Sequence, residues 1–147
     1  MDLNNLESLS FSGPELILTG TIILLIVLDL FIRNKRNLAV VAIIGCVASL
    51  LSAFDLYTAP QGWLFYRMVV LDNFSLFFKI VTLLAAICAI WMSLGSAEIK
   101  QVYQGEYYTL LLTCALGIFF MASSSNLLTA YLSLELVSLT SYVLTGF

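Results

Sequence analysis

Long apolar segments alternate with short polar breaks along the whole chain. A helix needs roughly 20 apolar residues to cross the hydrocarbon core of a bilayer. The pattern therefore predicts five transmembrane helices, at about residues 14–32, 38–54, 73–94, 106–122 and 126–147. The polar loops between them are too short to fold alone. The predicted fold class is all-α, a polytopic transmembrane helix bundle that forms a single membrane domain over residues 1–147.

The composition supports a membrane location. Of the 147 residues, 61% are hydrophobic and 10% are charged, and the mean hydropathy is +1.03. In soluble domains about a quarter of all residues are charged, so we expect an integral membrane protein in contact with a lipid bilayer. The net charge of −3 belongs to loops and helix ends and indicates no nucleic-acid partner.

The cysteines and the absence of histidine limit the chemistry that this chain can perform. Cys46, Cys88 and Cys114 fall in three different apolar segments, without the paired spacing of a disulfide framework or a thiolate metal site. The chain has no histidine, which excludes the commonest metal ligand and general base. We therefore expect no metal and no redox cofactor on this chain.

Basic residues in the short loops predict the orientation of the helices. With the N-terminus outside, the inner loops hold Arg33, Lys35, Arg36 and Lys100, and the outer loops hold Arg67 alone. Because inner loops carry the excess of lysine and arginine, this distribution favours an outside N-terminus.

The last apolar segment carries a polar stripe centred on a carboxylate. Tyr131, Glu135, Ser138, Tyr142 and Thr145 follow steps of four and three residues, which places them on one side of a helix. An ionisable residue at membrane depth is costly and usually functional. One interpretation is a proton-holding site that faces a protein interior or hydrated cavity. The alternatives are a carboxyl that burial keeps protonated, and one that only bonds a neighbouring helix.

Lys79 lies about two turns into the third apolar segment and shares its face with Asp72, Ser75 and Thr82. It could belong to an ion path. Alternatively, its long side chain could snorkel to the outer surface of the membrane.

Two acidic residues lie near the ends of the first apolar segment. Asp29 precedes Arg33 by four residues, a spacing that favours an interfacial ion pair. Glu15 lies in the expected first turn, where a carboxylate interacts with the positive end of the helix dipole.

The run GEYYTLLLTCALGIFFMASSSNLLTAYLSLELVSLTSYVLTGF, residues 105–147, resembles subunit N of the bacterial NADH:quinone oxidoreductase, respiratory complex I. Weaker matches precede it at residues 13–16 (GPEL) and 71–79 (LDNFSLFFK). The resemblance covers essentially the whole chain and corresponds to the N-terminal third of that subunit.

The resemblance implies a membrane-arm subunit that couples quinone reduction to proton transport in the bacterial inner membrane. Its partners would be the other membrane-arm subunits. The chain would act as part of an enzyme complex, a translocase, whose NADH, FMN, iron–sulfur clusters and quinone are bound outside this chain.

The resemblance also gives Glu135 a role, because it occupies the position of the family's fifth-helix glutamate, which is thought to pair with a lysine on the seventh helix. Glu135 is thus the candidate proton-transfer residue. Lys79, Tyr131, Ser138 and Tyr142 are candidate residues of the ion path.

The chain is much shorter than a complete subunit N, which is built from two inverted repeats of helices. We therefore expect an incomplete N-terminal fragment that does not pump by itself. Two other functions remain open from the sequence: a subunit of a cation/proton antiporter, and a non-catalytic structural membrane subunit.

Overall fold

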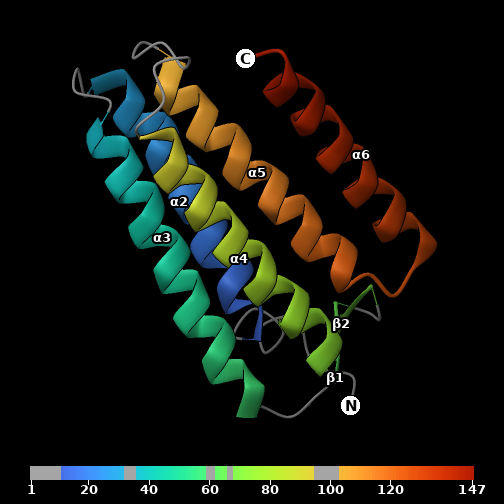
Figure 1. The fold of residues 1–147 in the computed structure, drawn as a ribbon. Helices are drawn as coiled ribbons and strands as arrows, with labels where there is room; N and C mark the ends of the chain where they lie inside the picture. Colours follow the sequence, from blue (N-terminus) through green and yellow to red (C-terminus); the bar gives the residue numbers. More distant parts are fainter. Residues whose placement is uncertain (1–10, 32–35, 59–61, 66–67, 95–102) are drawn as a thin grey trace.

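The predicted helices are all present in the computed structural model, which describes residues 11–31, 36–58, 62–65, 68–94 and 103–147. They are α2 (Gly13–Phe31), α3 (Arg36–Asp55), α4 (Asn73–Ser93), α5 (Gln104–Ala122) and α6 (Leu127–Thr145). Each is long and apolar enough to cross a membrane. The prediction of an all-α, polytopic bundle is confirmed (Figure 1).

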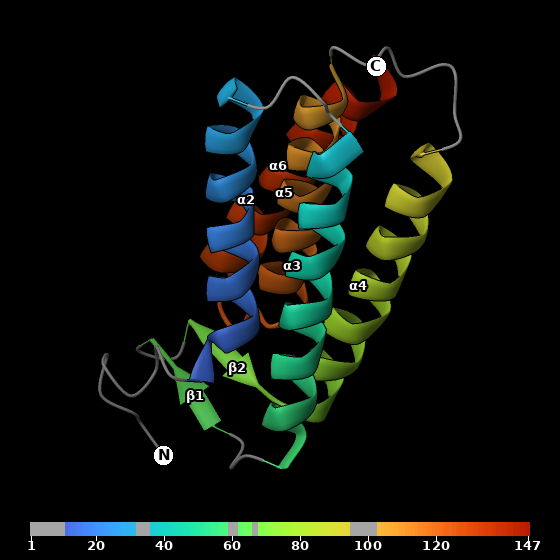
Figure 2. The same cartoon turned by 90° about the vertical axis from the view of Figure 1, so that its left-hand side faces the viewer.

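Four of these helices, α2 to α5, share one apolar core (Figure 2). Their buried side chains are spaced by three or four residues along each helix, as expected for a helix with one face turned to its neighbours. The largest of them are Leu18 and Leu25 of α2, Leu38 of α3, Leu83 and Ile90 of α4, and Tyr108, Leu112 and Phe119 of α5.

The fifth helix, α6, packs against α5 at the edge of this bundle (Figure 1). In the described structure only 11% of its membrane-length window is buried, compared with 33–39% for the other four helices. Most of the surface of α6 is therefore free to contact lipid or another protein segment.

A short β-hairpin closes the end of the bundle at which α2 and α4 begin (Figure 2). Strand β1 (Gly62–Leu64) pairs antiparallel with β2 (Val69–Leu71), and a 3-10 turn, η1 (Leu56–Thr58), joins α3 to this region. The sequence interpretation treated these residues as a loop. Strands of three residues are too short to show a recognisable alternation of polar and apolar positions.

The hairpin is hydrogen-bonded to the turn between α5 and α6. The amide of Val70 donates to the carbonyl oxygen of Ser123 at 2.8 Å, and the amide of Ser125 donates to that of Met68 at 3.1 Å. Val69 and Leu71 of the hairpin form a small buried apolar cluster with Leu76 of α4. The hairpin thus links the start of α4 to the start of α6.

At the opposite end of the bundle, Asp29 of α2 lies against α5. A Cβ atom built on Gly105 would come within 1.7 Å of the Asp29 Oδ1 atom, so the carboxylate occupies the space that the glycine leaves. The pair with Arg33 expected from the sequence lies outside the described residues.

Asp72 starts α4 through a capping box. Its Oδ1 atom accepts a hydrogen bond from the Ser75 amide at 2.8 Å, and the Asp72 amide donates to the Ser75 hydroxyl at 3.3 Å. Replacing a capping aspartate by alanine typically costs about 1 kcal/mol. We expect Asp72→Ala to lower the free energy of unfolding by about this amount, measured by denaturation in mixed detergent micelles. Asp72→Asn keeps the acceptor and is the matched control; equal losses in both variants would contradict the capping role.

Candidate functional site

Glu135 lies near the centre of α6, a 19-residue helix that is long and apolar enough to cross a membrane. The helix begins after Asn126, whose Oδ1 atom accepts a hydrogen bond from the Leu128 amide at 3.2 Å. Glu135 is the ninth residue of the helix, about 12 Å along its axis from the first, at a rise of about 1.5 Å per residue. A helix of this length places the half-buried carboxyl group near the middle of a bilayer.

The face of α6 that contacts α5 is the one that carries Ser133, Val137 and Thr140. Ser133 and Thr140 are buried, and their hydroxyls donate to carbonyl oxygens of their own helix, at Thr129 and Leu136. They therefore need no polar partner on α5 and allow the two helices to approach closely.

The polar stripe of Glu135 lies on the opposite side of α6, since the stripe is rotated by about half a turn from Ser133 and Thr140 at 100° per residue. Tyr131 and Tyr142 are 59% and 71% exposed. The expected orientation toward a protein interior is therefore not found within the described helices. The stripe faces away from them, on the side of α6 that α5 leaves uncovered.

Tyr131 and Glu135 are brought together on this stripe, because a residue and its fourth neighbour lie on adjacent turns. Ser138 is half-buried one turn further along. A row of hydroxyl groups on either side of a carboxyl can organise water, which is the arrangement that proton transfer requires.

An open, mostly apolar groove of about 720 Å³ borders the beginning of this stripe. It is lined by residues of α5, of the turn and of α6, namely Met121, Asn126, Leu127, Leu128, Ala130, Tyr131 and Leu134. The first residue of the stripe, Tyr131, therefore borders a concave apolar surface.

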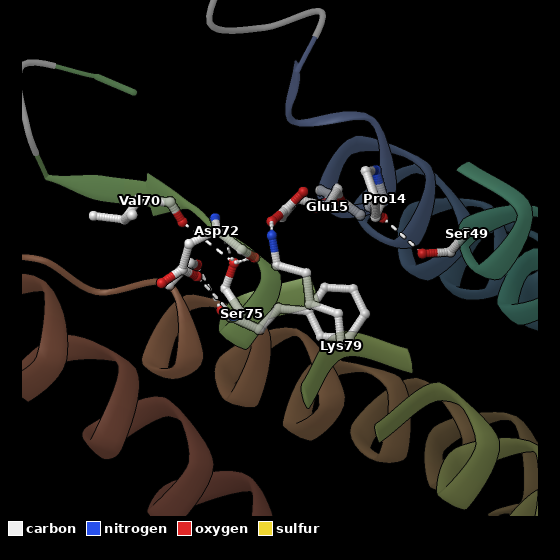
Figure 3. Close-up of polar contacts among 10 residues, drawn as sticks. Pro14, Glu15, Ser49, Val70, Asp72, Ser75 and Lys79 are labelled. Carbon is white, nitrogen blue, oxygen red and sulfur yellow. Dashed lines mark hydrogen bonds and ion pairs between the residues drawn. The ribbon is translucent and has the colours of Figure 1, made fainter. Parts of the chain in front are cut away.

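Lys79 of α4 is placed in a second polar site that sequence spacing did not reveal. It is 2% exposed and forms an ion pair with Glu15 of α2 (Figure 3). The structure therefore contradicts the snorkelling alternative. Glu15 does lie in the first turn of α2, as expected, but its carboxylate is also the partner of Lys79.

Two serine hydroxyl groups lie in the region of this ion pair, one on α3 and one on α4 (Figure 3). On α3, the Ser49 hydroxyl donates to the Pro14 carbonyl oxygen at 2.9 Å. One turn before Lys79, the Ser75 hydroxyl donates to the Asp72 carbonyl oxygen at 3.0 Å. Among the described residues, the Oε2 atom of Glu15 is buried without a hydrogen-bond partner.

The two polar sites are separate. The stripe of Tyr131, Glu135, Ser138 and Tyr142 lies on the outer side of α6, whereas Lys79 pairs with α2. In the part of the chain that the structure describes, no three histidine, cysteine or acidic residues lie close enough to hold a metal ion. The three cysteines lie on three different helices and do not fit an iron–sulfur cluster, which requires several cysteine ligands.

Close packing at Gly117 fixes the position of α6. A Cβ atom at Gly117 would lie 2.8 Å from Cγ2 and 3.3 Å from the backbone nitrogen of Val137. Overpacking of this kind costs about 1–3 kcal/mol, and we expect this loss for Gly117→Ala in detergent unfolding. Gly20→Ala is the matched control, because nothing lies within 4 Å of its Cβ position. If both variants were equally stable, the contact between α5 and α6 would have to be looser than described.

The chain is similar in sequence to bacterial respiratory subunits. It is 40% identical over 150 residues to the NADH-quinone oxidoreductase subunit N of Bacillus anthracis, covering 99% of this chain and 30% of that protein. It is 37% identical over 139 residues to subunit N 2 of Chloroherpeton thalassium, covering 91% and 27%. It is 38% identical over 135 residues to subunit N of Dehalococcoides mccartyi, covering 91% and 28%.

A scan against protein-family models found no match. The chain spans less than a third of the length of these curated relatives. Its five apolar helices define it as a multi-pass α-helical membrane protein. Over the part that it spans, the chain resembles NADH-quinone oxidoreductase subunit N, which confirms the resemblance predicted from residues 105–147.

Proposed function

We propose that this chain is part of a proton-translocating membrane-arm subunit of an NADH:quinone oxidoreductase. The observation that carries the proposal is the similarity to subunit N along 91–99% of the chain, in which Glu135 occupies the centre of a transmembrane helix. The subunit would couple quinone reduction to proton transport across the bacterial inner membrane, with the N-terminus outside.

In this proposal Glu135 takes up and releases the proton. Tyr131, Ser138 and Tyr142 line the path, because their hydroxyls lie on the same stripe as the carboxyl group and can hold a file of water molecules. A polar stripe in a membrane favours another helix as its partner. The uncovered side of α6 is thus the surface on which a further helix of a longer subunit would bring the partner lysine.

Movement of a nearby lysine can drive the uptake and release of a proton at such a glutamate. A lysine close to a glutamate favours the ionised carboxylate, and withdrawal of the lysine favours the protonated acid. Moving one charge against 100 mV requires about 2.3 kcal/mol. That free energy corresponds to a change in proton affinity of about 50-fold, which the approach or withdrawal of one charge at low dielectric can produce.

The redox chemistry would take place elsewhere in the parent complex, where NADH, FMN, iron–sulfur clusters and quinone are bound. The described residues of this chain offer no cysteine or histidine cluster for them. The other membrane-arm subunits and the lipid bilayer would be its partners.

The proposal is tested with a chimeric subunit. The segment of a bacterial subunit N that aligns with this chain is replaced by residues 1–147, and the complex is purified and reconstituted into vesicles. We expect the chimeric complex to assemble and to acidify one side of the membrane when NADH reduces quinone, as reported by a pH-sensitive dye.

The matched control is the same host complex with its own segment reinserted. An assembled chimera that reduces quinone without moving protons would contradict the proposed transport role. A chain that exchanges sodium ions for protons in vesicles without any redox partner would favour the antiporter alternative instead.

A further inference from the structure

We propose that Glu15 and Lys79 form a second proton-binding site of this chain, in which the Oε2 atom of Glu15 accepts the proton. The inference concerns α2 and α4 and holds independently of the role proposed for Glu135.

Burial and geometry single out this pair. Lys79 and Glu15 have side chains that are 2% and 7% exposed, so neither charge is solvated by bulk water. The Lys79 ammonium group contacts the Oε1 atom of Glu15, while Oε2 is buried without a hydrogen-bond partner in the described structure. A buried oxygen without a donor is costly. The site therefore has one open acceptor position, at Oε2.

The proposed step is a reversible protonation. A hydronium ion transfers its proton to Oε2, which forms one O–H bond in the carboxyl group, breaks one in the hydronium ion and leaves a water molecule. Lys79 keeps its proton, so the site changes from neutral to a single positive charge. Because a close ammonium group favours the ionised carboxylate, the step requires Lys79 to move away from the carboxyl group. Release to water reverses the step, and no oxidant, reductant or further reactant is needed.

The site lies close to one aqueous side. Glu15 is the third residue of α2, and Lys79 is about 9 Å along the axis of α4 from its first residue, at a rise of about 1.5 Å per residue. Both helices begin at the hairpin end of the bundle (Figures 1 and 2). Glu15 therefore lies within the first helical turn of α2, and Lys79 about two helical turns from the start of α4.

The other titratable groups of the surrounding elements do not occupy this position. Asp72 uses its Oδ1 atom to cap α4. Asp55 is exposed as the last residue of α3, and Tyr57 is exposed in η1. The remaining ones on the packed helices lie at mid-helix or toward the opposite end of the bundle, namely Cys46, Cys88, Cys114, Asp29, Tyr103, Glu106, Tyr107 and Tyr108. Lys79 is thus the one charged partner that the described residues provide for Glu15.

The test is infrared difference spectroscopy of the 147-residue chain in lipid nanodiscs, with the pH of the perfusing buffer as the variable. We expect a carbonyl band of a protonated carboxyl to appear as the pH is lowered and to shift in heavy water. The band should be lost in Glu15→Gln/Lys79→Met, which removes both charges together, and kept in Glu106→Gln, which removes an exposed carboxyl at the opposite end of the bundle.

A second variant separates proton binding from simple ion pairing. In Lys79→Arg the charge pair is retained, but a guanidinium group can donate to both carboxylate oxygens and so fill the open position on Oε2. We expect this variant to lose the band or to require a lower pH for it. A pH difference spectrum that is identical in the wild-type chain, in Glu15→Gln/Lys79→Met and in Lys79→Arg would overturn the inference.

The outcome is distinguishable from that of the proposed function. Absence of the Glu15 band in a chain whose chimeric complex pumps protons would remove the second site and leave the respiratory role intact. A Glu15 band in a chain whose chimera assembles without pumping would support the second site and contradict the respiratory role.

Discussion

Lys79→Met is expected to lower the free energy of unfolding by about 3–5 kcal/mol, because removing one partner of a buried ion pair leaves the other charge without compensation. In this variant the carboxylate of Glu15, now unpaired, stays at a position where its side chain is only 7% exposed. The loss is to be measured as the shift of the unfolding transition of the purified chain in mixed detergent micelles. The helix content at the start of the transition shows whether the variant is folded.

The double variant Glu15→Gln/Lys79→Met is the control for charge burial. Since replacing a whole buried pair by neutral groups of similar volume is often neutral or stabilising, we expect it to recover most of the lost stability. A single variant as stable as the wild-type chain would mean that Lys79 and Glu15 are solvated, contrary to the burial of both side chains.

Glu135→Gln, introduced into the chimeric subunit, is expected to reduce NADH-driven proton translocation by at least about tenfold, since a positioned acid–base group typically contributes 10²–10⁴-fold to proton transfer. Glutamine keeps the size and the hydrogen-bonding capacity of the side chain but cannot carry a proton. The rate of acidification is measured in vesicles and divided by the amount of assembled complex.

Two conservative variants accompany this measurement. Glu135→Asp keeps a titratable carboxyl and should retain part of the transport. Tyr131→Phe removes the hydroxyl that lies one helical turn before Glu135 on the same stripe and should have a smaller effect than loss of the carboxyl. If proton translocation persisted at the normal rate in Glu135→Gln, Glu135 would be a structural hydrogen-bonding group and the role proposed for it would be wrong.

The five helices could be predicted from the sequence because their physical cause is local. Each requires one uninterrupted apolar segment, and the breaks between them are polar or rich in glycine and proline. The membership of Tyr131 and Glu135 in one stripe was equally accessible, since it depends only on the 3.6-residue period of one helix.

The pairing of Glu15 with Lys79 could not be predicted in the same way. The two residues belong to helices that are separated in the chain by α3 and the hairpin. Spacing indicates which residues share a face of one helix, but it does not indicate which helix that face will meet. The sequence places Glu15 in a first helical turn and Lys79 on a polar face of its own helix, and neither observation indicates the other residue as a partner.

The sequence also does not indicate which side of α6, the Glu135 stripe or the opposite one, faces α5. Polar residues in a membrane helix are expected to face other protein segments. The hydroxyls of Ser133 and Thr140 donate to carbonyl oxygens of their own helix, so these residues can also pack against α5. Two polar faces therefore compete for the same neighbour. The close contact of Val137 with Gly117 is what fixes the face that meets α5.

The hydrogen bonds between the hairpin and the turn after α5 set an order on the insertion of the chain into the membrane. Strand β2 is synthesised before α4 and α5, but its partners at residues 123–125 follow both helices. The chain must cross the bilayer twice more before these partners return to the hairpin side. The hydrogen bonds between the hairpin and residues 123–125 can therefore form only after α5 has crossed the bilayer. Until then, the backbone N–H and C=O groups at the edge of strand β2 are available to other binding partners.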